Sequence, residues 1–145
     1  MLDQKQQHSI PLKEEIQYIQ SYLDIEQVRF QDRLAIKYEI ADNTLDCIVP
    51  NLILQPLVEN ALKHGFSRRI DAGWIRLKSE ILDQKQLLLI VEDDGEGLQE
   101  NYQEGIGLKN VQERLKQMYG EQASLTLLSP EPKGCMAQIL IPIDT

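Results

Sequence analysis

The stretch that most constrains the fold is a run that is apolar on both of its faces, Gln86–Glu92. A strand of this composition is buried on both sides, so it belongs at the centre of a sheet and not at its edge. The predicted strand before it, Trp74–Leu82, is separated from it only by the turn Asp83–Lys85. Two strands joined by so short a turn pair as an antiparallel hairpin. The sequence therefore predicts a sheet whose central strand has an antiparallel neighbour.

The rest of the chain alternates irregularly between helical and strand patterns. Apolar residues at three- and four-residue spacing predict helices over 11–30, 50–65 and 108–119, with Pro11 and Pro50 in the first turns of the first two. Period-two alternation predicts strands over 34–40, 124–128 and 136–141. We expect residues 1–10 to be flexible. The expected fold class is α/β, a two-layer α/β sandwich with a mixed, mainly antiparallel sheet and helices on one face.

Size and composition limit the classes of function. The length of 145 residues predicts a single domain over 1–145. The net charge of -8 argues against a nucleic-acid binder, although backbone N–H groups, lysines and a metal ion can still hold a nucleotide. Cys47 and Cys135 have neither metal-ligand nor disulfide spacing, which favours a reducing compartment. Since the longest apolar run, Leu87–Val91, is too short to cross a bilayer, we expect a cytoplasmic domain without membrane contact.

An amide stands on the apolar side of the predicted helix over 50–65. Leu57 precedes Asn60 by three residues and Ile53 by seven, so all three share one helical face. An amide on such a face costs about 1–3 kcal/mol unless it finds hydrogen-bond partners. Asn60 either bridges neighbouring backbone groups or faces a polar ligand or a metal ion. The helix alone leaves both interpretations open.

An acidic residue and two pairs of glycines follow the central strand. Asp93 stands at the strand end with Gly95 and Gly97 behind it, and Gly105 and Gly107 open the next predicted helix. Taken singly, each glycine pair is typical of a tight turn. The second pair fails the dinucleotide-binding fingerprint because a third glycine is missing. A P-loop is excluded, and the acidic run does not meet the spacing of a calcium-binding EF-hand loop.

Together with the helix amide, these groups predict a nucleotide site. A carboxylate at a strand end can accept a hydrogen bond from the exocyclic amine of adenine, and glycines beside it let the backbone approach the base. Glycines that lead into a helix present free N–H groups to phosphates at the positive end of the helix dipole. An Asn side-chain oxygen is a ligand that Mg²⁺ accepts.

Three stretches in order carry a specific resemblance: Leu54–Gly65 (LQPLVENALKHG), Val91–Gly97 (VEDDGEG) and Gly105–Leu115 (GIGLKNVQERL). They resemble the N, G1 and G2 boxes of the GHKL ATPases, which include gyrase, histidine kinases and the mismatch-repair ATPase MutL. Their sequences are similar to those in the catalytic, ATP-binding domain of LytS-type sensor histidine kinases. The first predicted helix, with Tyr22-Leu23 and Arg29-Phe30, fits that family too. The resemblance covers nearly the whole chain.

The resemblance implies ATP and Mg²⁺ as cofactors and gives a role to each matching position. Asn60 would hold Mg²⁺, and Asp93 would bind the adenine amine. The glycines and the leucine of the other two boxes would line the base pocket (Gly95, Gly97) and lie near the phosphates (Gly105, Gly107, Leu108). The segment Leu98–Glu104 would form a short lid over the phosphates.

Two charged residues beside Asn60 have less settled roles. Lys63, one turn further on, could reach a phosphate, or it could form an exposed pair with Glu59 worth about 0.3–0.5 kcal/mol. His64 is interpreted as a histidine at the helix end, near the negative pole of the dipole.

Departures from the family pattern refine the prediction. Family members that hydrolyse ATP carry a glutamate one turn before the Asn, where this chain has Pro56, so efficient intrinsic hydrolysis is not expected. Gly134-Cys135 stands where the family often has Gly-Thr, which leaves a water-mediated adenine contact open. Asp94 replaces a common Asn, a minor change. The acceptor histidine is missing, because His8 has neither a Pro-His-Phe context nor a helix around it.

The hypothesis is therefore a histidine kinase, represented here by the catalytic domain of a two-component sensor. It would transfer the γ-phosphate of ATP to a histidine on a missing phosphoacceptor domain of a membrane-anchored protein, with a response regulator downstream. Two alternatives remain: a non-catalytic module that senses ATP or ADP, and a GHKL ATP hydrolase.

Overall fold

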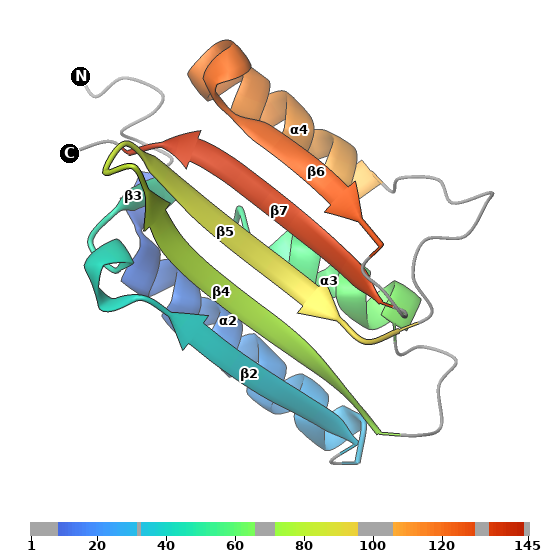
Figure 1. The fold of residues 1–145 in the computed structure, drawn as a ribbon. Helices are drawn as coiled ribbons and strands as arrows, with labels where there is room; N and C mark the ends of the chain where they lie inside the picture. Colours follow the sequence, from blue (N-terminus) through green and yellow to red (C-terminus); the bar gives the residue numbers. More distant parts are fainter. Residues whose placement is uncertain (1–8, 32, 66–71, 96–105, 130–133, 144–145) are drawn as a thin grey trace.

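The computed structural model describes residues 9–31, 33–65, 72–95, 106–129 and 134–143, with only the backbone of 64, 65 and 106. Figure 1 labels the elements in chain order. Their bounds are β1 (Ser9–Pro11), α2 (Leu12–Arg29), β2 (Leu34–Ile40), η1 (Asp42–Thr44), β3 (Ile48–Pro50), α3 (Gln55–Gly65), β4 (Gly73–Leu82), β5 (Gln86–Asp93), α4 (Ile106–Tyr119), η2 (Gly120–Gln122), β6 (Ser124–Leu128) and β7 (Cys135–Pro142).

The main sheet has the strand order β2-β4-β5-β7-β6, so the strand that is apolar on both faces lies at its centre (Figure 1). β2 runs parallel to β4, and the other three pairs are antiparallel. The predicted mixed, mainly antiparallel sheet is confirmed. The long connection from β2 to β4, which contains α3, makes the parallel pair possible.

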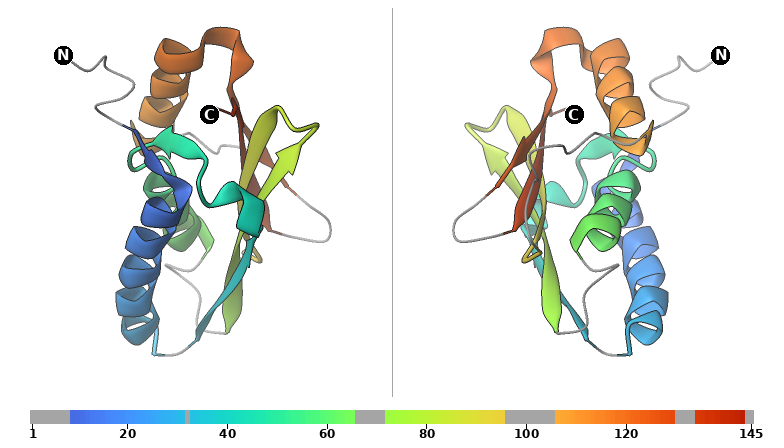
Figure 2. Two further views of the ribbon diagram at one scale, coloured as in Figure 1. Left: turned by 90° about the vertical axis from the view of Figure 1, so that its left-hand side faces the viewer. Right: turned by 90° about the vertical axis from the view of Figure 1, so that its right-hand side faces the viewer.

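Helices α2, α3 and α4 lie on one face of this sheet, which confirms the predicted two layers (Figure 2). Alternate residues of the central strand, Leu87, Leu89 and Val91, belong to the core between the layers. The buried residues of the helices meet them there, among them Leu23 of α2 and Leu115 of α4. Since the side-chain period of a strand is two, Asp93 points to this same covered face.

The first half of the chain contains a small sheet that was not expected, and one helix begins later than expected. Ser9–Pro11 pairs with Ile48–Pro50 in this antiparallel sheet, while residues 1–8 of the end that was expected to be flexible lie outside the described part. Pro50 was expected to open the helix of Asn60, but it ends β3, and α3 begins at Gln55. Proline suits the end of a short strand as well as the first turn of a helix, and here Pro56 takes the helical place.

The other predicted elements are confirmed with small shifts at their ends. The first helix spans 12–29 instead of 11–30. The last helix ends at Tyr119, the end that was predicted, and Gly120 follows it at a positive φ of 64°. Within the described residues, no helix is both long enough and apolar enough to span a membrane.

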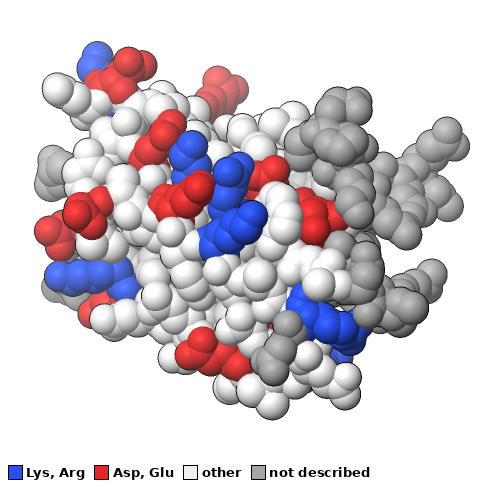
Figure 3. Space-filling model, turned by 60° about the horizontal axis from the view of Figure 1, so that its bottom comes forward, with Lys and Arg blue, Asp and Glu red and all other residues white. Residues whose placement is uncertain are grey.

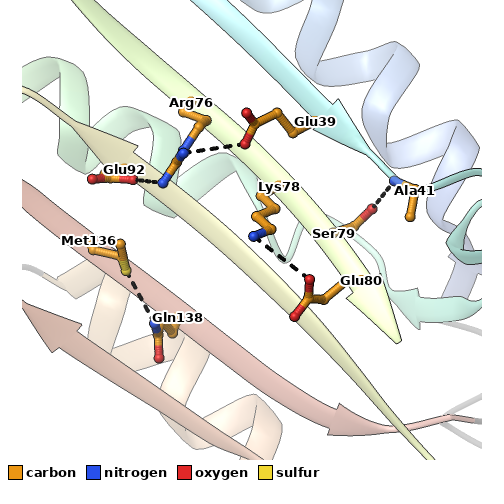
Figure 4. Close-up of polar contacts among 9 residues, drawn as sticks. All are labelled: Glu39, Ala41, Arg76, Lys78, Ser79, Glu80, Glu92, Met136 and Gln138. Carbon is orange, nitrogen blue, oxygen red and sulfur yellow. Dashed lines mark hydrogen bonds and ion pairs between the residues drawn. The ribbon is translucent and has the colours of Figure 1, made fainter. Parts of the chain in front are cut away.

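The open face of the sheet carries pairs of opposite charge. Arg76 of β4 contacts Glu92 of β5 and lies 3.4 Å from a carboxylate oxygen of Glu39 on β2, so it links three strands (Figure 4). On the side shown in Figure 3, basic and acidic side chains are intermixed. Glu92 thus belongs to the open face, and its neighbour Asp93 belongs to the face under the helices.

Candidate functional site

The site is built around Asp93, the last residue of the central strand. Its neighbours in the strand register are Ile75 of β4 and Cys135 of β7, and only 4% of Asp93 is exposed. Directly paired residues point to the same face of a sheet, so all three lie on the side of the helices. The Asp93 Oδ1 atom accepts a hydrogen bond of 2.8 Å from the backbone N–H of Gly95. The carboxylate is therefore held at the strand end and oriented by the first glycine behind it.

Asp94 has a different function from its neighbour. Its Oδ1 atom accepts a hydrogen bond of 2.9 Å from the backbone N–H of Trp74, at the start of β4. This contact ties the end of the central strand to the adjacent strand. Asp94 therefore supports the chain around Asp93 and keeps the strand end in place.

Gly134 lets β7 begin directly against Asp93. Its φ of +121° is a conformation that residues with a side chain rarely adopt, and a Cβ here would lie 2.4 Å from the Asp93 carbonyl oxygen. A side chain is thus excluded twice, by the backbone conformation and by the lack of space. In the sequence this glycine stands out only as part of a family pattern, because Asp93, its close neighbour in space, lies 41 positions away in the chain.

Cys135 lies beside the carboxylate in the strand register. Burial, and secondly the negative charge of Asp93, raise the pKa of the Cys135 thiol to about 11. At neutral pH the sulfur is therefore a protonated thiol, a weak hydrogen-bond donor at the edge of the site. Burial likewise raises the pKa of Cys47, which lies in the core cluster.

The first turn of α3 meets the first turn of α4. A Cβ at Gly107 would lie 3.5 Å from the Cβ of Pro56, an ordinary van der Waals distance. Asn60 follows Pro56 by four residues and so lies on the same side of α3, where it is half-buried. α3 also contacts β5 and β7, the strands that carry Asp93 and Cys135. Asn60 is thereby placed on the helix layer, on the side of α3 that faces the beginning of α4.

The remaining predicted site residues differ in their surroundings. Lys63 is exposed, and Glu59 accepts a hydrogen bond of 3.0 Å from the Gln55 side chain. Leu108 is 2% exposed and packs in the core, so a phosphate could meet only its backbone. Gly97, Gly105, the predicted lid Leu98–Glu104, His8 and the side chain of His64 lie outside the described residues.

Sequence reasoning missed two residues that hold the segment in front of α3. Glu15 of α2 is completely buried, and its carboxylate accepts hydrogen bonds from the backbone of Leu52 and Leu54. Arg114 of α4 donates to the carbonyl oxygen of Asn51 at 2.6 Å. The signal for Glu15 was present, since it stands three residues after Leu12 on the apolar stripe of the helix.

The donor groups of the site fit a nucleotide better than a metal held by protein alone. Within the described part of the chain, no group of three or more His, Cys, Asp and Glu side chains is arranged to hold a metal ion. A single amide oxygen, that of Asn60, is a hard ligand which Mg²⁺ accepts when phosphate oxygens and waters complete its coordination. The buried carboxylate of Asp93 suits an amine donor.

Comparisons with known proteins agree with this geometry. The sequence profile described as "Histidine kinase-, DNA gyrase B-, and HSP90-like ATPase" matches residues 48–145, and one described as "Histidine kinase" matches residues 1–34. YwpD, an uncharacterised protein of Bacillus subtilis, is 36% identical over 138 residues, which cover 89% of this chain and 49% of YwpD. The sensor protein LytS of Oceanobacillus iheyensis is 31% identical over 148 residues, which cover 92% of this chain and 25% of LytS.

The chain thus spans about half or less of the length of these two relatives. Among solved structures, the chain is similar to the histidine kinase domain of a blue-light activated histidine kinase from Erythrobacter litoralis. That similarity has a TM-score of 0.72 with 27% identity, and it covers 92% of this chain and 62% of the other.

Gly120 and Gly134, both at positive φ, form a matched pair for a stability test. Gly134→Ala should lower the free energy of unfolding by roughly 3 kcal/mol or more, because strain and the clash with Asp93 add. Gly120→Ala should cost only about 1–2 kcal/mol, since nothing lies within 4 Å of the added methyl group. Urea unfolding of both variants measures the difference, and equal losses would contradict the close approach at Gly134.

The raised pKa of Cys135 predicts a slow reaction with iodoacetamide at pH 8, because the thiolate is the reactive form. Mass spectrometry should show complete alkylation of Cys135 in urea within a time that leaves the native thiol intact. Asp93→Asn should speed up the native reaction, since it removes the neighbouring negative charge. Fast alkylation of the native wild-type chain, with a midpoint near pH 8.5, would be inconsistent with the burial and charge described here.

Proposed function

We propose that the chain is the ATP-binding catalytic domain of a sensor histidine kinase. The premise is that it belongs to the family of histidine kinase-, DNA gyrase B- and HSP90-like ATPases. In this proposal it transfers the γ-phosphate of ATP to a histidine on a separate phosphoacceptor domain. The observation that carries the proposal is Asp93, a buried carboxylate at the end of the central strand, on the face under the helices. The sensor kinases among the relatives support the same function.

Asp93 would bind the adenine base. Its Oδ1 atom already accepts the Gly95 N–H, which fixes the plane of the carboxylate. A carboxylate accepts from the exocyclic amine of adenine, whereas the corresponding position of guanine is a carbonyl oxygen that would repel it. Ile75 and Cys135, its partners in the register, would border the base with an apolar side chain and a protonated thiol. Gly97 would contribute from the same loop.

Asn60 would hold Mg²⁺, and the start of α4 would bind the phosphates. Gly107 lies so close to Pro56 that an added Cβ would be 3.5 Å from the Cβ of Pro56, and this proximity brings the side of α3 that carries Asn60 toward the first turn of α4. The first N–H groups of a helix have no partner within the helix, and they attract anions. For this reason we assign the binding of the phosphates to Gly105, Gly107 and the backbone of Leu108. Lys63 would approach the phosphates from the side that faces solvent. When bound, the metal neutralises charge that develops on the transferred phosphoryl group.

Transfer to histidine is favoured over hydrolysis. Activation of a water molecule needs a proton acceptor, and the side chain of Pro56 offers none at the position one turn before Asn60. A histidine nucleophile carries its own lone pair, so the domain has only to orient ATP and stabilise its charge. In the same proposal a response regulator receives the phosphoryl group from that histidine, and the domain is the cytoplasmic part of a membrane-anchored protein.

The adenine assignment predicts that Asp93→Asn weakens ATP binding about tenfold or more, the equivalent of one hydrogen bond to a charged group. The wild-type chain should prefer ATP to GTP, and the variant should lose this preference because Asn also offers a donor. Titration calorimetry measures both nucleotides. Asp46→Asn, at an exposed residue of the loop before β3, is the control and should bind like the wild type. Unchanged ATP affinity in Asp93→Asn would refute the role of this carboxylate.

The transfer reaction requires the full chain, MgATP and a purified helical fragment that bears the acceptor histidine of a LytS-type kinase. We expect acid-labile phosphate on the fragment and little free phosphate. Asn60→Ala should reduce transfer about tenfold or more through loss of a metal ligand, whereas Asn43→Ala, at an exposed residue of η1, should not. ATP binding without transfer would favour a nucleotide-sensing module, and rapid phosphate release without the fragment would favour a hydrolase.

A further inference from the structure

Glu15 is a completely buried carboxylate in the first turn of α2, outside the three sequence boxes. It lies on the side of α2 that packs into the core, three residues after Leu12 and four before Ile19. A buried carboxylate needs hydrogen-bond donors around it, because desolvation otherwise makes it very costly. Within the described part of the chain, Glu15 finds its donors in one short segment, residues 51–54, which leads from β3 into α3.

The two oxygens of Glu15 divide this segment between them. Oε1 accepts the N–H of Leu52 at 3.1 Å, and Oε2 accepts the N–H of Leu54 at 2.9 Å. Leu52 has a positive φ of 58°, which residues with a side chain rarely adopt, so the segment needs outside contacts to keep this turn. The carbonyl oxygen of Leu54 then accepts the N–H of Val58, in the first turn of α3. Glu15 thus fixes the residues from which the helix starts.

Arg114 holds the same segment from the opposite helix. Its Nη2 atom donates to the carbonyl oxygen of Asn51 at 2.6 Å. Its positive charge also acts on Glu15, where it opposes the effect of burial on the pKa. The N–H groups of the segment are therefore bound by α2, and its first carbonyl group is bound by α4. Residues 51–54 are thus bound by α2 and α4 and lead directly into α3.

The energetics of Glu15 favour a function in positioning over a function in stability. Burial raises the pKa of the Glu15 carboxyl, and the N–H groups of Leu54, Leu52 and Ile53 only partly counteract it. A carboxyl whose pKa is higher in the folded state lowers stability as the pH rises through the window between the two pKa values. Above this window the ionised group therefore contributes less to the stability of the fold than an exposed glutamate would. Buried charges of this kind are retained in some proteins because they define one arrangement.

We propose that Glu15 and Arg114 are positioning residues, which together clamp residues 51–54 and so set α3, with Asn60, against the first turn of α4. The functional part of this inference, the effect of the clamp on Mg²⁺ binding by Asn60, rests on the proposed function, because it requires that the chain binds MgATP. Its structural part, the clamp itself, stands on the contacts alone. The clamp also links α2, the helix matched by the second kinase profile, to the helix that carries Asn60.

Glu15→Gln tests the clamp with little change in shape. The glutamine keeps one acceptor oxygen, but its NH₂ group faces a backbone N–H, so one of the two hydrogen bonds is lost. Glu14→Gln is the matched control, since Glu14 is its exposed neighbour on the same helix. Both variants are made in the full 145-residue chain.

The first measurement is amide hydrogen exchange without nucleotide, followed by NMR. Glu15→Gln should raise the exchange rates of Leu54 and Val58 about tenfold or more, and Glu14→Gln should leave them unchanged. The second is calorimetry with ATP in the presence and absence of Mg²⁺. MgATP binding should weaken about tenfold in Glu15→Gln and metal-free binding much less, because Asn60 is displaced while Asp93 on β5 stays in place.

Arg114→Gln releases the same segment from the other side and should reproduce both effects. The double variant should lose less than the sum of the single losses, since both residues act on one segment. If Glu15→Gln fails to fold, Arg114→Gln alone decides. Normal exchange in Arg114→Gln and Glu15→Gln, or equal weakening with and without Mg²⁺, would overturn the inference. Failure of the wild-type chain to bind ATP would instead overturn the proposed function. The exchange rates, which are measured without nucleotide, would still test whether Glu15 and Arg114 hold residues 51–54.

Discussion

The structure depends on a central strand that is apolar on both faces and ends in a charged residue. Apolar side chains of β5 pack under the helices, and β4 and β7 satisfy its backbone on both edges. A carboxylate that follows such a run in the same strand is carried to the edge of the core, where only 4% of it reaches solvent. Burial of this kind is tolerated when donors surround the group. The Gly95 N–H provides one in the chain itself, and a nucleotide base would provide another from outside.

The periodic parts of this fold could be predicted from sequence because each periodicity has a physical cause. The run Gln86–Glu92 was expected at the centre of the sheet because both of its faces are apolar, and β5 has that place. Alternation in 34–40, 124–128 and 136–141 was sufficient for three more strands, and the helical spacing in α2 and α4 was equally clear. The start of α3 was not predictable in this way. Local sequence allows a proline at either Pro50 or Pro56 to begin a helix, and pairing with Ser9–Pro11, about 40 residues away, decides between them.

The candidate site shows the same division between local and distant information. The amide at Asn60 and the acid at Asp93 were visible because each interrupts an apolar pattern. Gly134 and Glu15 contact residues that are far away in the chain. Gly134 leaves space for the Asp93 carbonyl oxygen, and Glu15 accepts hydrogen bonds from the N–H groups of Leu52 and Leu54. A single sequence does not contain these pairings.

The position of Pro56 connects the fold to the type of chemistry. Proline lacks a backbone donor, and the first turn of a helix is the place where that lack costs nothing. Its ring packs toward Gly107, so the residue that is unable to activate water also brings α3 against α4. Glu15 and Arg114 fix the preceding segment by its N–H and carbonyl groups, which leaves α3 few ways to shift along α4. A domain that transfers a phosphoryl group to an external nucleophile needs such fixed distances more than it needs a base of its own.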